Sequence, residues 1–503
     1  MSTTVTPADQ EGQVSGWRRY LTPSIGDVVF IAVFAAAVYL GDILTNLDGD
    51  HLRHLRLGWS ILDGAIPRVD VYSYTVTGAE LIPHWWLSQA GFAAAERWLG
   101  FDGIGLLTAL LAAIPWAIIY RWLVRRNVPV SLSAGMSLLG AAASVIHWAA
   151  RPHAFTWLFI VAWVLLLDDL RAGRRSQVWW LIPLSALWAN FHAGFIIGIL
   201  LVATYLLGAL FDTWRHRWPK DESTRARHLG IVLVGTAAVS VLTPAGIKTI
   251  INAYAYLGQD YLIDVTREYA SPDFHHILTW PFLLMILVSI IRSHRWNVTH
   301  LLLVLSWTAA ALYSLRNIPI YAIVVTPVVA MSLVDDWSRL RIRLRRGVSS
   351  KLQEYSTLER GLAGGLLAVV FAVAVSIAVV NAPGSRFALR DQVFPIRAME
   401  ALGPDVPGDR PFHTFKWGGY LEYCCHPDVL VFIDGQTDIY GEEITSDYVE
   451  AIRAEPNWRG IFERHGVDWV LIESNSPLAQ VLAEASDWEE IYRDDTAAVF
   501  VAA

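Results

Sequence analysis

The chain has 503 residues, of which 54% are hydrophobic and 17% are charged, and its mean hydropathy is +0.39. Soluble domains carry roughly 25% charged residues, so this composition excludes an ordinary soluble protein and predicts a polytopic membrane protein. The formal net charge of -7 shows no basic excess, and we therefore expect no nucleic-acid partner.

The first 26 residues form a polar tail, and no small-residue cleavage site follows the apolar run behind it. We therefore expect an uncleaved N-terminus. Runs of about 20 apolar residues are long enough to cross a bilayer, and we count about eleven such runs between residues 27 and 381. The predicted transmembrane helices are 27–45, 104–123, 131–149, 154–170, 177–190, 194–213, 229–246, 278–293, 298–314, 319–335 and 362–381.

Basic residues gather between these runs. If the helices alternate in direction, all of the clusters fall on one side, which the positive-inside rule assigns to the cytoplasm. The N-terminus is then cytoplasmic and the C-terminus extracytoplasmic, in a multi-pass protein of the plasma membrane. The clusters are Arg18/Arg19, Arg125/Arg126, Arg171/Arg174/Arg175, Arg215–Arg227, Arg292/Arg295 and Arg339–Arg346.

The first predicted extracytoplasmic loop, residues 46–103, is long and has a structure of its own. Its start, TNLDGDHLRHLRLG (45–58), combines acidic, histidine and arginine side chains with leucines at helical spacing. We expect an amphipathic helix on the membrane surface, extended chain over 67–78 and a second interfacial helix over 84–100. So polar a cluster at a membrane boundary is costly to desolvate, which indicates that water or a substrate meets it there.

Three acidic side chains on this side are candidates for chemistry. Asp48 and Asp50 form a D-x-D pair, and Glu268 lies in a later loop. A carboxylate beside a cavity can act as a general base toward an acceptor hydroxyl. The three oxygen donors could instead bind a divalent cation such as Mg²⁺ or Mn²⁺. A third interpretation is structural, since Asp48-Gly49 suits a turn and Asp50 could cap the following helix.

Basic and histidine side chains accompany these carboxylates on the predicted extracytoplasmic side. The positive-inside rule should deplete arginine there, and guanidinium groups match phosphate geometry. We therefore predict an anionic ligand at the membrane surface, with a lipid phosphate as the first candidate. Surface ion pairs and interfacial hydrogen bonds are the alternative roles. The candidate binding residues are Arg53, Arg56, Arg151, Arg267, Arg316, Glu268, His54, His84, His153 and His192.

Residues 382–503 have a soluble composition and follow the last predicted span. Runs of β-branched and aromatic residues predict strands over 429–434, 468–473 and 497–502, and helical stretches such as 445–466 lie between them. We therefore expect a small extracytoplasmic α/β domain.

Two short features of this domain carry further hypotheses. Cys424 and Cys425 are adjacent and cannot join distant segments, so the chain has no disulfide framework. Asp434-Gly435 and Asp438 follow a predicted strand, where loops often bind ligands, although a simple turn is the alternative.

Several motifs together resemble the GT-C superfamily of integral-membrane glycosyltransferases, and within it multi-pass bacterial and archaeal proteins. The motifs are DGDHLRHLRLG (48–58), PRVDVYSYT (67–75), HWWLSQ (84–89), EYASP (268–272), WGGYL (417–421) and FIDGQTDIY (432–440). Members of that superfamily place an Asp in a long first loop after the first helix and take sugars from polyprenyl phosphate or pyrophosphate carriers.

The resemblance implies that Asp50 or Asp48 is the catalytic base, and Asp50 fits the motif better because it directly precedes a helix. His51 stands where many relatives carry Glu, so metal use is the less secure part of the analogy. We therefore expect an inverting-type transferase that moves a sugar from a polyprenyl-phosphate donor among membrane lipids to a lipid, glycan or protein acceptor. The alternatives are an O-antigen-ligase or polymerase-like enzyme and a lipid or solute transporter.

Overall fold

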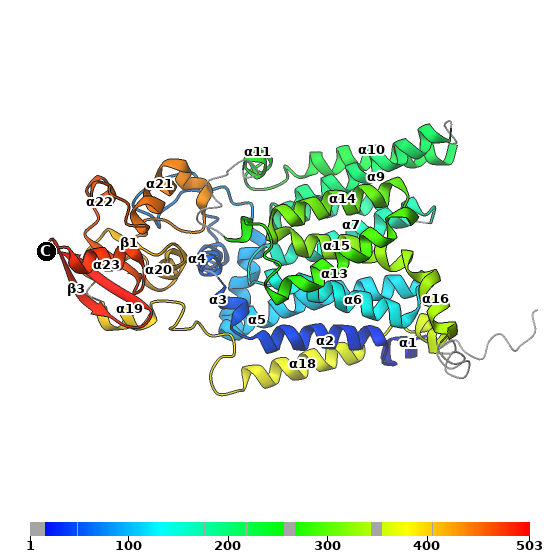
Figure 1. Cartoon of the computed structure of the whole chain (residues 1–503), viewed down its shortest axis with the longest axis horizontal. Coiled ribbons are helices and arrows are strands. Elements are labelled where there is room, and N and C mark those ends of the chain that lie inside the picture. The colour runs from blue at the N-terminus through cyan, green and yellow to red at the C-terminus, as the bar shows by residue number, and fades with distance from the viewer. Residues whose placement is uncertain are drawn as a thin grey trace, which may run out of the picture.

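A computed structural model describes residues 16–47, 49–174, 177–216, 220–255, 267–343, 355–404 and 406–503. The described chain forms an elongated helical bundle with a smaller mixed domain at one end, and the C-terminus lies at the far tip of that domain (Figure 1). The predicted fold class, a helical membrane protein with a C-terminal α/β domain, is confirmed.

The bundle contains nearly all of the long helices. Their bounds are α1 Arg18–Leu21, α2 Ile25–Leu40, α3 Ile43–Asn46, α4 Asp50–Leu62, α5 Trp86–Arg125, α6 Val130–Ser144, α7 His153–Arg171, α8 Leu181–Phe191, α9 Phe195–Arg215, α10 Lys220–Val239, α11 Lys248–Ala255, α13 Trp280–Arg292, α14 Val298–Tyr313, α15 Ile318–Ser332, α16 Val334–Arg343 and α18 Leu366–Val380.

Each predicted transmembrane range overlaps at least one of these helices, although the bounds differ; the range 229–246, for example, extends past the end of α10 at Val239. Among the described residues, seven helices are long and apolar enough to cross a membrane, or eight if the bent pair Tyr355–Gly361 and Leu366–Val380 counts as one span. The two shorter apolar helices are Val178–Phe191 and Val298–Tyr313. A multi-pass membrane protein follows from these lengths, while the predicted number of spans stays a prediction.

Local sequence explains where the helices begin and break. Ser24 and Asp27 form a capping box at the start of α2, with the Ser24 hydroxyl accepting from the Asp27 N–H. Asn297 caps α14 in a similar way. Gly100 has a φ of 62° and divides α5 into two helices, so the interfacial helix predicted over 84–100 is its first part.

Helix α4 is more deeply buried than predicted. Leu52 and Leu55 pack into the core, but Arg53 and His54 on other faces are buried as well. A Cβ added at Gly58 would overlap the Gln89 carbonyl of α5, which shows how closely these two helices approach. The helix therefore lies between the bundle and the C-terminal domain rather than on an open membrane surface.

The C-terminal domain, residues 382–503, is built on a four-stranded sheet of order β1-β2-β4-β3, with one parallel and two antiparallel pairs. Alternate residues of β2 face two different cores, which explains its continuous apolar run. The elements are α19 Ile396–Leu402, β1 Pro411–His413, α20 Gly418–Cys425, α21 Thr437–Ile452, α22 Trp458–His465, β2 Trp469–Glu473, α23 Pro477–Glu484, β3 Trp488–Arg493 and β4 Ala497–Ala502.

The strand predicted over 429–434 is wrong. Val431 makes only an isolated bridge to Ser73 of the first loop, with its N–H donating to the Tyr72 carbonyl at 2.9 Å. The apolar run is buried because it packs between the domain and this loop. The two predicted strands over 468–473 and 497–502 are present as β2 and β4.

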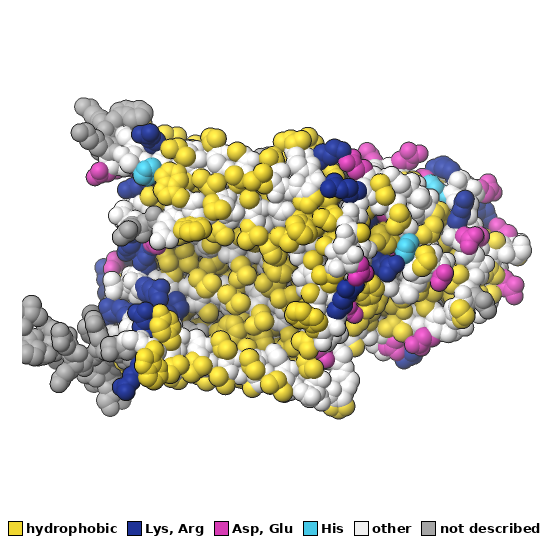
Figure 2. Space-filling model, turned by 180° about the vertical axis from the view of Figure 1, so that it is seen from behind, with side chains coloured by type: hydrophobic (Ala, Val, Ile, Leu, Met, Phe, Trp, Pro, Cys, Tyr) yellow, Lys and Arg dark blue, Asp and Glu magenta, His cyan; other side chains and the backbone are white. Residues whose placement is uncertain are grey.

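On the face shown in Figure 2, a broad hydrophobic band crosses the bundle. Many Lys and Arg side chains gather at the edge of this band farthest from the C-terminal domain (Figure 2). Pairs such as Arg126 with Asp168, at 3.7 Å, join the helices at that end. This arrangement agrees with the predicted clustering of basic residues, and the assignment of that end to the cytoplasm stays a prediction.

Candidate active site

One cavity of about 390 Å³ lies where the bundle meets the C-terminal domain. Nine predicted site residues line it, although they come from widely separated parts of the chain. They are Asp50, Arg53, His54, His84, Arg151, His153, His192, Glu268 and Arg316.

Arg151 joins the two described candidate carboxylates. Its Nη2 lies 2.7 Å from Asp50 Oδ2 and its Nη1 lies 2.9 Å from Glu268 Oε2. Asp50 is the first residue of α4, and Arg151 lies two residues before the start of α7. An acidic residue in the first turn of a helix is favoured by the helix dipole, so its position serves both the helix and the ion pair.

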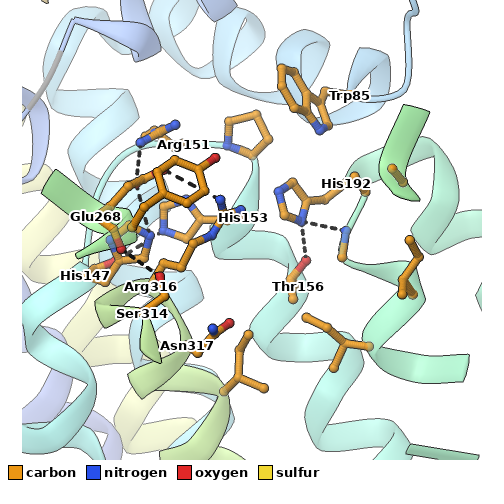
Figure 3. Close-up of a pocket in the computed structure, with 18 of the residues that line it drawn as sticks. Trp85, His147, Arg151, His153, Thr156, His192, Glu268, Ser314, Arg316 and Asn317 are labelled. Carbon is orange, nitrogen blue, oxygen red and sulfur yellow. Dashed lines mark hydrogen bonds and ion pairs between the residues drawn. The ribbon is translucent and has the colours of Figure 1, made fainter. Parts of the chain in front are cut away.

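Glu268 is the centre of a charged group that includes Arg151, Arg316 and His147 (Figure 3). Burial alone would raise the pKa of Glu268, but the charges of Arg151, Arg316 and His147 lower it to about 2. The guanidinium of Arg316 also lies 4.8 Å from the ring centre of Tyr269. Glu268 is therefore ionised throughout the physiological range and orients two arginines toward the cavity.

The segment that carries Glu268 is fixed by backbone contacts. Ser314 Oγ donates to the Glu268 carbonyl at 2.9 Å, and the Leu315 N–H donates to the Ala270 carbonyl at 3.0 Å. These bonds tie the EYASP motif to the turn that follows α14. They explain how two segments far apart in the sequence share one site.

Three histidines, His147, His153 and His192, lie close to the start of α7. The rings of His147 and His153 stack with centroids 4.4 Å apart. His192 Nδ1 accepts from the Gly194 N–H at 3.0 Å and lies 2.9 Å from Thr156 Oγ1, beside the cavity (Figure 3). Burial and the charge of Arg316 lower the pKa of His192 well below its usual value, so this ring is neutral near pH 7.

His84 and His54 both pack edge to face against the Trp85 ring, at centroid distances of 4.2 and 5.0 Å. Burial lowers the pKa of both imidazoles. His54 Nδ1 contacts Gln89 Nε2 at 3.1 Å, which requires the amide to donate. These rings therefore form a neutral, aromatic part of the cavity wall.

Arg53 has a different environment from the one we predicted. It is 1% exposed, and its Nη1 lies 2.7 Å from both Glu422 and Asp434 of the C-terminal domain. Its Nη2 lies 3.5 Å from Asp70. Burial alone would lower the pKa of Arg53, but these carboxylates raise it. Its charge is satisfied by protein carboxylates, which favours a role in joining the two domains over phosphate binding.

Of the remaining predicted site residues, one does not line the cavity and two have side chains outside the described part of the structure. Arg56 is not among the residues that line the cavity, and its guanidinium lies 5.9 Å from the Trp59 ring centre. Asp48 and the side chain of Arg267 lie outside the described residues.

The two described candidate ligands, Asp50 and Glu268, do not by themselves form a site for the predicted divalent cation. Within the part of the chain that the structure describes, no three His, Cys, Asp or Glu side chains are grouped as metal ligands. Between Asp50 and Glu268 lies the guanidinium of Arg151, which repels a cation. Asp48, the third predicted ligand, lies outside the described residues, so metal binding stays a prediction.

Part of the cavity lining is apolar. Ile197 and Leu200 of α9, Trp307 of α14 and Ile320 of α15 contribute to it. Leu200 is 50% exposed and Tyr313, which also lines the cavity, is 67% exposed. The cavity lining therefore combines charged side chains with apolar side chains of the bundle, two of which reach the molecular surface.

Some lining residues were not predicted. His147 was placed inside a transmembrane span, although its position at the end of an apolar run could have indicated a boundary. Trp85 and Gln436 lie in the HWWLSQ and FIDGQTDIY motifs but were not predicted as site residues, and Thr156 and Asn252 carry no charge and belong to no predicted motif. The closure of the cavity by the C-terminal domain could not be read from local sequence.

No protein-family model matches the sequence, and no curated protein sequence matches it. Among solved structures, the archaeal oligosaccharyltransferase AglB from Archaeoglobus fulgidus, in complex with an inhibitory peptide and a dolichol-phosphate, gives a TM-score of 0.58. The identity is 12%, over 91% of this chain and 70% of that chain. The oligosaccharyltransferase of the same organism tethered to an acceptor peptide gives 0.58 at 11% identity, over 89% and 69%. The chain has the GT-C fold.

This GT-C fold confirms the resemblance drawn from the first-loop motifs at the level of architecture. ArnT from Cupriavidus metallidurans bound to undecaprenyl phosphate gives a TM-score of 0.46 at 12% identity, over 94% of this chain and 97% of that chain.

Proposed function

We propose that this chain is a membrane glycosyltransferase that takes a sugar from a polyprenyl-phosphate carrier and transfers it to an extracytoplasmic acceptor. The cavity carries the proposal, because its lining combines arginines with apolar side chains of the bundle helices. A phosphate attached to a long isoprenoid chain likewise combines a negatively charged group with an apolar one. The dolichol-phosphate in the AglB complex supports the same donor class.

In the proposed reaction, the acceptor hydroxyl oxygen forms a bond to the anomeric carbon as its proton passes to the carboxylate of Asp50. The bond from that carbon to the phosphate oxygen breaks, and the carrier leaves as polyprenyl phosphate. Attack opposite the leaving group inverts the anomeric centre. Arg151 and Arg316 stabilise the negative charge that develops on the phosphate, since fixed guanidinium groups act strongly in a cavity shielded from water.

Asp50 and Asp48 remain the two candidates for the base, and we favour Asp50. Its carboxylate lines the cavity and lies 2.7 Å from Arg151, so a single guanidinium separates the proton acceptor from the proposed phosphate position. Glu268 is the less suitable base, because its pKa of about 2 leaves little affinity for a proton.

The test uses the full chain in lipid nanodiscs with radiolabelled decaprenyl-phospho-sugars (glucose, mannose and galactose), and host membranes supply the acceptor. We expect transfer by the wild type and a loss of about 100-fold or more in Asp50→Asn. Asp63→Asn is a matched control, because Asp63 lies at the end of the same helix with its side chain 65% exposed. Full activity in both Asp50→Asn and Asp48→Asn would contradict the assignment of the base.

A further inference from the structure

The part of the cavity next to the C-terminal domain contains a group of side chains that the proposed reaction does not use. It comprises Asn252 of α11, Gln436 before α21, and His84 and Trp85 before α5, all of which line the cavity. Asp438 is not among the lining residues, and its carboxylate accepts hydrogen bonds from the amides of Asn252 and Gln436. Three separate segments of the chain therefore meet at this point.

The two amide side chains are held in one orientation. Asn252 Nδ2 donates to Asp438 Oδ2 at 3.0 Å, and Gln436 Nε2 donates to Asp438 Oδ1 at 2.6 Å. A carboxylate only accepts hydrogen bonds, so each amide must turn its nitrogen toward Asp438. Neither amide carbonyl accepts from another described residue. The pair is therefore fixed with its oxygens available to a hydrogen-bond donor.

The indole of Trp85 at this place lacks a hydrogen-bond partner. Trp85 Nε1 has none within the described part of the chain, and the His84 ring beside it is only 4% exposed and is hydrogen-bonded to the Ile82 backbone. Leaving a buried polar group unsatisfied costs about 1–3 kcal/mol, so such groups usually serve a ligand or a water molecule. The rings of His84 and Trp85 lie 4.2 Å apart, so the two side chains are in contact.

We propose that this group is a carbohydrate subsite that binds the ring of a neutral sugar. Hydroxyl groups donate to the fixed carbonyls of Asn252 and Gln436, and the indole of Trp85 supplies an N–H donor and an apolar face. The carboxylate of Asp438 disfavours a uronate, whose negative charge would lie close to it. The inference rests on the proposed function, and the sugar could belong to the donor or to a glycan acceptor.

The first arm of the test addresses the donor. Binding of decaprenyl phosphate and of decaprenyl-phosphoglucose, -mannose, -galactose and -galacturonate is measured for the wild type, Gln436→Met and Asn252→Leu in nanodiscs. We expect at least one neutral glycolipid to bind the wild type tighter than bare carrier, and the galacturonate form to gain nothing. Each variant should lose about 3- to 10-fold of the neutral glycolipid affinity and none of the bare-carrier affinity. Gln480→Met, at an exposed site in α23, is the matched control.

The second arm addresses the acceptor. Wild type and Gln436→Met, both loaded with decaprenyl phosphate, are compared on an array of neutral oligosaccharides. If the variants lose affinity for the neutral glycolipid in the first arm, the subsite binds the donor sugar. If Gln436→Met loses only oligosaccharide binding in the second arm, the subsite binds the acceptor. If neither arm changes, or if bare-carrier affinity falls equally, the subsite is wrong. Failure of the wild type to bind decaprenyl phosphate at all would instead contradict the proposed function.

Discussion

Asp50 Oδ2 and Arg151 Nη2 lie 2.7 Å apart, which joins the start of α4 to the loop before α7 at the wall of the cavity. The Gly435 backbone covers the same carboxylate, because a Cβ added at Gly435 would overlap Asp50 Oδ1. The position of the proposed base therefore depends on three segments, one of which belongs to the C-terminal domain.

Gly435→Ala tests this dependence. The added methyl group must displace either the Asp50 carboxylate or the loop before α21, and small displacements of a catalytic group are costly. We expect sugar transfer to fall by about 100-fold while thermal unfolding in detergent changes little. Gly135→Ala is the control, since its Cβ would meet no atom within 4 Å. Unchanged transfer by Gly435→Ala would mean that Asp50 is not held by this contact.

Arg316→Gln tests the proposed phosphate position. A guanidinium that contacts the phosphate contributes about 1.5–3 kcal/mol, so we expect decaprenyl phosphate to bind roughly 10- to 100-fold more weakly. Arg68→Gln is the comparison, because Arg68 is on the same side of the bundle and donates to the Pro244 carbonyl instead. Equal affinities of the two variants for decaprenyl phosphate would contradict a contact between the phosphate and Arg316.

Arg53→Met should destabilise the chain strongly. The change leaves the buried carboxylates of Glu422 and Asp434 without their cation, and breaking such a group costs about 3–5 kcal/mol. The loss should appear as a lower unfolding temperature and faster proteolytic release of the C-terminal domain. Arg97→Met removes only an exposed pair with Asp63, for which we expect at most about 1 kcal/mol. Similar stability in both variants would contradict the role of Arg53.

Glu268→Gln should show a pH-dependent loss of stability. The folded-state pKa of Glu268 is about 2, below its ordinary value of 4.5. A carboxyl with a lowered folded pKa stabilises the fold fully above the unfolded pKa, and this contribution is lost as the pH falls toward the folded pKa. We expect the variant to be about 3 kcal/mol less stable at pH 7, with the difference shrinking below about pH 4.5. Unfolding temperatures between pH 7 and pH 3.5 measure this, and a constant difference would contradict it.

Much of the fold could be predicted because the membrane imposes strong patterns on sequence. Apolar runs located the helices, and the polar first loop identified Asp50, with Arg151 and Glu268 following from their predicted side. Arg53 was misjudged, because sequence reveals a charge but not the partners that bury it. The run at 429–434 looks like a strand by composition, and only its tertiary contact with Ser73 decides otherwise.

The glycine pair Gly418-Gly419 shows why the cavity itself could not be predicted. A Cβ at Gly419 would overlap the carbonyl of Gly49, so the WGGYL motif is a docking surface for the first loop. The sequence shows the motif, but it does not show that the first loop packs against it. Uncharged lining residues such as Asn252 and Gln436 were missed for the same reason.

The cavity wall at Gly435 and Gln436 has a consequence for how the protein matures. Ribosomes make these residues after all of the described apolar helices, so the bundle can insert while its cavity is still open on that side. A nascent chain or a truncated product that ends before this loop is expected to be catalytically silent. If the chain acts as proposed, synthesis of this loop would complete the site, and premature sugar transfer during membrane insertion would be avoided.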